Sequence, residues 1–122
     1  MIIKKKPEIT VLDNNVTIAT DKIEYVESVS VGTWFGVGTR HETEAQNGIA
    51  HLLEHMFFKG TSRRSSKDIA EQIEFVGGHL NADTSWEQTA FFARTLLEDV
   101  FLAVDLLSDI SQHSLCDENV LE

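Results

Sequence analysis

The stretch Asn47-Gly-Ile-Ala-His51-Leu-Leu-Glu54-His55-Met-Phe-Phe58 places three chemically active side chains within five residues and is followed by Lys59-Gly60. It predicts a helix over residues 47–58 that ends before the glycine. At about 100° per residue, with Ile49 at 0°, His51, Glu54 and His55 fall at about 200°, 140° and 240°. The opposite side of the helix is one apolar stripe of Ile49, Leu52, Leu53, Met56 and Phe57. We therefore expect an amphipathic helix with three polar groups on a single arc of about 100°.

These three side chains have the chemistry of a metal centre. His51 and His55 are one helical turn apart, so both imidazoles can meet at one metal ion. Zinc suits two neutral imidazoles plus a carboxylate and keeps a fourth position open. Glu54 lies too close to the pair to be an obvious third ligand, but it can accept a proton from water as a general base. The order His-x-x-Glu-His inverts the commoner His-Glu-x-x-His motif. A five-residue pattern also recurs by chance, and a solvated helix face has the same geometry, so a plain polar face is the alternative.

The surrounding chain predicts an α+β domain. Before the helix, residues 9–12 and 16–19 read as short strands around a polar turn, residues 25–37 as a longer strand and residues 38–46 as a loop. After it, Ser65 or Ser66 caps a helix with Ile69, Ile73 and Phe75 inward, which Gly77-Gly78 ends. Residues 79–85 and 89–97 read as a hairpin, residues 98–113 as a helix and residues 117–122 as the opening of another. The predicted fold is an antiparallel sheet with helices packed on one face.

Composition narrows the class of protein. The 122 residues, 42% hydrophobic and 25% charged, fit one domain spanning residues 1–122. Ten basic against twenty acidic residues give a net charge of −10, which argues against a nucleic-acid partner. No apolar run approaches the roughly 18 residues of a membrane span. The basic start, residues 1–7, has no apolar segment after it and is no secretory signal.

Two runs carry a resemblance to a known family. Residues 47–61, Asn-Gly-Ile-Ala-His-Leu-Leu-Glu-His-Met-Phe-Phe-Lys-Gly-Thr, resemble the zinc-site signature of the pitrilysin family, which includes insulin-degrading enzymes and the mitochondrial processing peptidase. Residues 77–89, Gly-Gly-His-Leu-Asn-Ala-Asp-Thr-Ser-Trp-Glu-Gln-Thr, resemble its second landmark. The likeness covers most of residues 25–122 and is closest to the bacterial and mitochondrial processing-peptidase branch.

The resemblance implies that His51 and His55 bind zinc and that Glu54 activates water. The family's third ligand is a Glu on a later helix, which we expect beyond Glu122; Glu118 or Glu122 itself is a weaker alternative. Family members are much longer, with two or more homologous domains closing on the substrate. The chain therefore resembles a truncated, N-terminal part of one peptidase domain, and we expect it to be inactive alone, with zinc absent or weakly bound.

The second landmark implies a substrate site on an extended segment. Residues 80–85 follow glycines that permit unusual backbone turns, and a peptide could add to this segment as a strand. The family binds substrates in this way, and the residues concerned would be Asn81, Ala82, Asp83 and Thr84. A plain hairpin with turn glycines is the alternative.

We predict a zinc-dependent endopeptidase acting on extended peptides. The alternative is a non-catalytic partner subunit, or an inactive fragment that serves as a peptide-binding module. Expected partners are a further domain of the same chain or a homologous subunit. Basic peptides are the expected substrates, because acidic residues flank the site: Glu42, Glu44, Asp83 and Glu87. The expected location is the bacterial cytoplasm, or the mitochondrial matrix if a transit peptide has been removed.

The remaining reactive side chains receive local interpretations. We expect His41 and His79 to be solvated or locally hydrogen-bonded, and His113 to interact with its helix C-terminus. Cys116 is interpreted as a small buried hydrophobe, although S-ribosylhomocysteine lyases pair an inverted motif with a distant cysteine ligand. The basic turn at residues 62–66 is expected to be a solvated loop.

Overall fold

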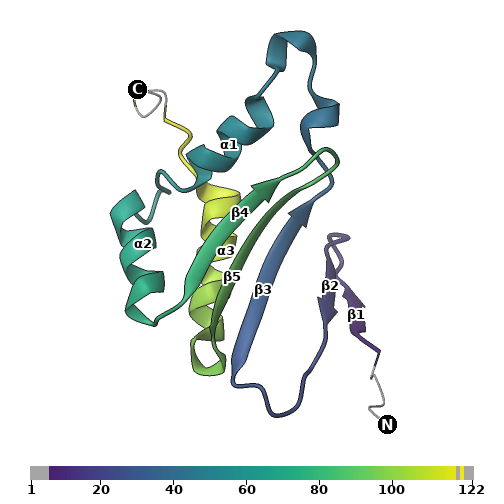
Figure 1. Cartoon of the computed structure of the whole chain (residues 1–122), viewed down its shortest axis with the longest axis vertical. Coiled ribbons are helices and arrows are strands. Elements are labelled where there is room, and N and C mark those ends of the chain that lie inside the picture. The colour runs from purple at the N-terminus through teal and green to yellow at the C-terminus, as the bar shows by residue number, and fades with distance from the viewer. Residues whose placement is uncertain (1–5, 118, 120–122) are drawn as a thin grey trace.

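The computed structural model describes residues 6–117 and 119, and Figure 1 shows their arrangement. Strands β1 (Glu8–Val11) and β2 (Thr17–Thr20) form an antiparallel pair of their own. Strands β3 (Ser28–Phe35), β4 (His79–Thr84) and β5 (Thr89–Leu96) form an antiparallel sheet in the order β3-β5-β4. The helices are α1 (Ile49–Phe57), α2 (Ser66–Phe75) and α3 (Val100–His113). None of them is long and apolar enough to cross a membrane. The predicted α+β class is confirmed.

The core lies between the helices and one face of the three-stranded sheet. Phe91 and Ala93 alternate along central strand β5 with more exposed neighbours, so both point toward the helices. The ring of Phe91 stacks on Phe57 and lies against Phe58, with centroids 5.0 and 5.9 Å apart. The rest of the core comes from α2 and α3: Ile69, Ala103, Leu107 and Ile110. The C-terminal end of α1 is therefore fixed to the middle of the sheet.

Strand β4 brings the second landmark beside α1. Among the described residues it pairs only with β5, so its other edge is free. The hairpin turn beyond Thr84 is attached to the segment that leads into α1, because Ser85 and Trp86 carbonyls accept the N–H groups of Thr39 and Arg40 at 3.1 and 2.9 Å. Gly38 makes this approach possible, since a Cβ there would lie 2.4 Å from the Ser85 oxygen.

The turn at residues 62–66 is exposed at four of its five residues, as predicted, but its half-buried Arg64 and exposed Arg63 also pair with α3. Asp109 of α3, whose side chain is fully buried, accepts hydrogen bonds from Thr61 Oγ1 (2.8 Å), Arg63 Nε (3.0 Å) and Arg64 Nη1 (2.7 Å). Both arginines also bond Asp105. Burial alone would raise the pKa of Asp109, but the hydrogen bonds from Arg64, Thr61 and Arg63 lower it to about 2. This cluster ties the loop after α1 to α3.

Several local predictions need correction. The strand predicted over residues 25–37 is shorter, and Tyr25 is fully exposed with φ +69°. Phe75 is exposed rather than inward, because it lies about 200° around α2 from buried Ile73. Cys116 is exposed, not buried. The helix opening predicted over residues 117–122 includes positions outside the described residues, Glu118 and Glu122 among them.

The apolar stripe of α1 is only partly buried. Met56 is buried and Phe57 packs on the core, but Ile49, Leu52 and Leu53 each remain at least 40% exposed. The reason is that α1 reaches the sheet through its C-terminal turn, while its N-terminal part extends past the strand ends (Figure 1). Periodicity predicts the correct face of the helix, but not how much of that face is covered.

Candidate metal centre

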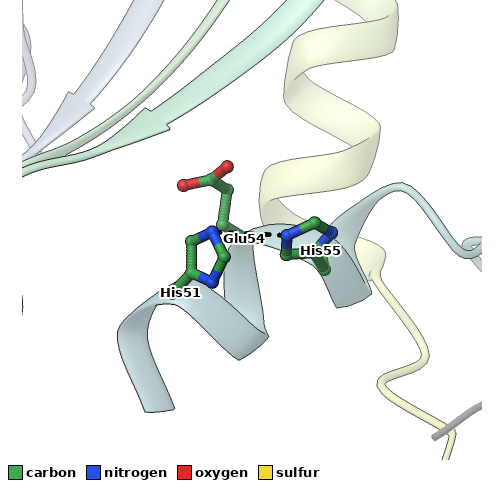
Figure 2. A group of neighbouring side chains, drawn as sticks. All are labelled: His51, Glu54 and His55. Atoms are coloured by element: carbon green, nitrogen blue, oxygen red, sulfur yellow. Dashed lines mark hydrogen bonds between the residues drawn. The ribbon is translucent and has the colours of Figure 1, made fainter. Parts of the chain in front are cut away.

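The three side chains of the motif lie together on α1, as Figure 2 shows. His51 and His55 are exposed and Glu54 is half-buried. The two Nε2 atoms are 3.3 Å apart, and each of the three residues offers a potential ligand atom within 4.8 Å of the others. No other group of three or more His, Cys, Asp or Glu residues within the described part of the chain has this geometry. The expected helix thus brings the three groups together.

The spacing of the imidazoles fits a tetrahedral zinc ion. Two nitrogens at Zn–N distances of about 2.0–2.1 Å, separated by a tetrahedral angle, lie about 3.3–3.4 Å apart. His51 Nε2 and His55 Nε2 show that separation, with ring planes at 82°. The separation of the two ring nitrogens is therefore the one that two ligands of a single tetrahedral ion would have.

The carboxylate of Glu54 is held by the sheet. The Thr84 hydroxyl, at the end of β4, donates a hydrogen bond to Glu54 Oε2. Thr84 is on the helix-facing side of the strand, in line with Leu80 and Ala82, which pack on the core. Sequence reasoning did not find this contact, since it joins residues 30 positions apart.

The Glu42 carboxylate caps the N-terminal end of α1. The helix begins after Gly48, whose φ is +89°. A glycine has no side chain that could cap the free N–H groups of the first turn. The Glu42 carboxylate accepts the N–H groups of Gly48 and Ala50 at 2.8 and 2.9 Å. These two hydrogen bonds, from Gly48 first and then Ala50, lower the pKa of Glu42. From the sequence, Glu42 is expected only as a charged loop residue near the site. The signal for its capping role is the glycine before the helix, which has no side chain to accept the first N–H groups.

The four residues predicted to bind substrate do not face one way. Ser85 N–H donates to Gln88 O at 2.8 Å, so these two residues form a hydrogen-bonded pair of the β4–β5 ladder. Because such pairs alternate along an antiparallel ladder, the backbone groups of Thr84, Ala82 and Leu80 point to the free edge of β4. Asn81 Oδ1 accepts the Ala82 N–H at 2.8 Å, which agrees with an Ala82 N–H that makes no hydrogen bond to β5. The side chains of Asn81 and Asp83 are exposed on the sheet face away from the helices. Only Thr84 contacts the motif.

The other candidates lie apart from the motif. His41 Nδ1 accepts the Gly38 N–H at 3.1 Å, as expected for local hydrogen bonding, and His79 is exposed. His113 Nδ1 lies 3.3 Å from Asp109 Oδ1. Of the acidic residues predicted to flank the site, Glu87 pairs with Arg40. Glu44 and Asp83 are exposed and form no ion pair with the residues that the structure describes.

Comparisons with known proteins agree with this structure. Residues 17–122 match the family model described as "Insulinase (Peptidase family M16)". The chain is 45% identical over 115 residues to the mitochondrial-processing peptidase subunit beta of Lentinula edodes, covering 94% of this chain and 25% of the relative. It is 49% identical over 109 residues to the uncharacterized zinc protease YmxG of Bacillus subtilis, covering 89% and 27%. A protease structure from Helicobacter pylori superposes with a TM-score of 0.89 at 27% identity, covering 93% and 28%.

The fold and these relatives place the chain in a family of peptidases whose named members include zinc proteases. The chain belongs to the insulinase family, peptidase family M16, which confirms the resemblance found in residues 47–61 and 77–89. It spans about a quarter of the length of the curated relatives it matches.

Proposed function

We propose that this domain forms part of a zinc-dependent endopeptidase, with His51 and His55 as metal ligands and Glu54 as general base. The observation that carries the proposal is the 3.3 Å separation of the two imidazole nitrogens beside a carboxylate held by Thr84. Bound zinc would supply a Lewis acid that polarises the scissile carbonyl. Glu54 accepts a proton from the attacking water and delivers it to the leaving amine. A third protein ligand comes from outside these 122 residues.

The substrate is an extended peptide that adds as a strand to the free edge of β4. Ala82 and Thr84 offer backbone groups there, and main-chain hydrogen bonds of this kind bind peptides with little sequence preference. Asn81 Oδ1 now accepts the Ala82 N–H, so it must release this donor when a peptide carbonyl replaces it. Asn81 would then be free to bond the peptide itself, while Asp83 contributes charge near the strand.

Partners and location remain part of the proposal. A homologous domain or subunit closes over the peptide, and basic peptides are preferred. The relative named as a beta subunit supports the presence of a partner subunit. The relatives include mitochondrial and bacterial proteins, so the matrix and the bacterial cytoplasm are the two locations proposed.

The test is Glu54→Gln in the complete protein. Peptide hydrolysis should fall by at least about 10²-fold, because general-base help is lost, while zinc content stays at the wild-type level. Glu71→Gln is the matched control, since Glu71 is an exposed residue of α2 paired with Lys67; its activity should equal that of wild type. An E54Q protein that retains wild-type turnover would refute the role of the base. A wild-type protein that binds peptides without cleaving them would favour the non-catalytic subunit.

A further inference from the structure

We propose that Thr84 is a positioning residue for Glu54: its hydroxyl fixes the carboxylate beside the histidine pair and links that carboxylate to the strand that receives the peptide. The inference rests on the proposed function, because it assigns Thr84 a role in the reaction of Glu54. It starts from one contact between two elements, the hydrogen bond from Thr84 Oγ1 to Glu54 Oε2.

Glu54 needs such a partner. Its carboxylate is separated from the helix backbone by three rotatable bonds, so an unrestrained side chain would sample many positions. Within the described residues, no other side chain hydrogen-bonds this carboxylate. With Oε2 held by a hydroxyl, the second oxygen has no donor among the described residues and is available to a proton on water.

Thr84 is suited to hold it. A β-branched side chain has few χ1 rotamers, so the direction of its hydroxyl follows the backbone. That backbone is held from both sides, by the pairing of Asp83 with Ala90 and by the Ser85 N–H that donates to Gln88 O at 2.8 Å. The donor therefore belongs to the rigid sheet, whereas the acceptor belongs to a helix whose N-terminal part extends past the sheet.

The same residue faces the peptide with its backbone. Thr84 directs its N–H and C=O to the free edge of β4, while its hydroxyl points to α1. A peptide on this edge would thus bind directly to the residue that orients the base. Loss of the hydroxyl should disturb the chemical step and leave the main-chain bonds to the peptide intact.

The experiment compares Thr84→Val and Thr84→Ser with wild type in the complete protein. Valine keeps the shape and the backbone but removes the donor, so kcat should fall by about ten- to a hundredfold while KM stays within about twofold. Serine keeps the donor and should recover activity to within a few-fold of wild type. Thr89→Val is the matched control: Thr89 is paired with Thr84, but its hydroxyl donates to Val37 O at 2.9 Å, and its activity should be unchanged.

Two further readouts separate positioning from simple loss of structure. In crystal structures, Glu54 should keep one carboxylate orientation in wild type and T84S and lose it in T84V, with equal zinc content throughout. In an E54Q background, T84V should cause no additional loss, because its effect passes through the missing carboxylate.

The outcomes also distinguish this inference from the proposed function. If E54Q is inactive but T84V has wild-type kcat, the role of Thr84 is wrong and the peptidase assignment stands. A T84V protein with raised KM and unchanged kcat would show that the side chain binds peptide instead. If T84V and T84S lose activity equally, or T84V reduces the residual E54Q activity further, positioning is likewise overturned. If E54Q itself is fully active, the proposed function fails first.

Discussion

Replacing Asp109 by asparagine tests whether the buried cluster stabilises the domain as its geometry implies. The substitution keeps the size of the side chain and removes its charge, leaving Arg64, whose side chain is only 13% exposed, without its buried partner. The pKa of Asp109 is about 2 in the folded protein against an ordinary 3.8, which corresponds to about 2 kcal/mol of stability at neutral pH. Breaking a buried pair by removing one partner costs up to about 5 kcal/mol. We therefore expect D109N to lower the free energy of unfolding by about 2–5 kcal/mol at pH 7.

The stability that Asp109 contributes should depend on pH. Because the pKa of Asp109 is lower in the folded than in the unfolded state, its contribution is fully present above about pH 4 and is lost as the pH falls toward 2. Wild type should thus approach D109N in stability over that interval. In the wild-type protein, protonated Asp109 can no longer accept charge-assisted bonds from Arg63 and Arg64.

The assay is urea unfolding followed by tryptophan fluorescence, at pH 7 and at steps down to pH 2.5. Asp21→Asn is the control, since Asp21 is an exposed residue in the loop after β2 and should change stability by less than about 0.5 kcal/mol. A D109N protein as stable as wild type at pH 7, or a difference that stays constant down to pH 2.5, would refute the reasoning.

Two other predictions concern α1 and the substrate. Glu42→Gln should weaken zinc binding several-fold at pH 7, because the first turn of α1 loses the charged carboxylate that accepts its N–H groups. Competition with a chelator measures this, and equal zinc affinities at pH 7 would contradict it. Peptides with Arg/Lys flanks should be cleaved with higher kcat/KM than the same scaffold with Glu/Asp flanks, because Asp83 is exposed on β4 and Glu44 is exposed in the segment before α1. This difference in kcat/KM should narrow in high salt, and equal, salt-independent constants would contradict the prediction.

Sequence predicted those parts of the molecule that depend on neighbours along the chain. The helix after Ser65 begins with a capping box, in which Ser65 Oγ accepts the Asp68 N–H and the Asp68 carboxylate accepts the Ser65 N–H. The His-x-x-Glu-His motif is likewise local, because one helical turn joins its histidines. Phe75 is apolar like its neighbours Ile69 and Ile73, but it lies about 200° around the helix from Ile73 and is exposed.

Contacts between distant segments could not be predicted in this way. Thr84 reaches Glu54 only because β4 ends where α1 passes it, and Asp109 reaches Arg63 and Arg64 across more than 40 residues. In each case both partners are polar residues common on solvated surfaces, so nothing in composition or spacing marks them as a pair. Their pairing follows from the packing of α1 and α3 on the same face of the sheet.

Polar contacts, together with the burial of its C-terminal turn, set the position of α1. Its N-terminal apolar residues remain substantially exposed, and its buried side chains are Ala50 and Met56 alone among the described residues. Glu42 holds its first turn, Thr84 holds its middle through Glu54, and the Asp109 cluster fixes the loop that follows it. Charge-assisted hydrogen bonds have directional geometry, whereas apolar contacts tolerate sliding. A helix that must keep two imidazole nitrogens a few ångströms apart beside a carboxylate is therefore anchored at three points by groups that specify angle as well as distance.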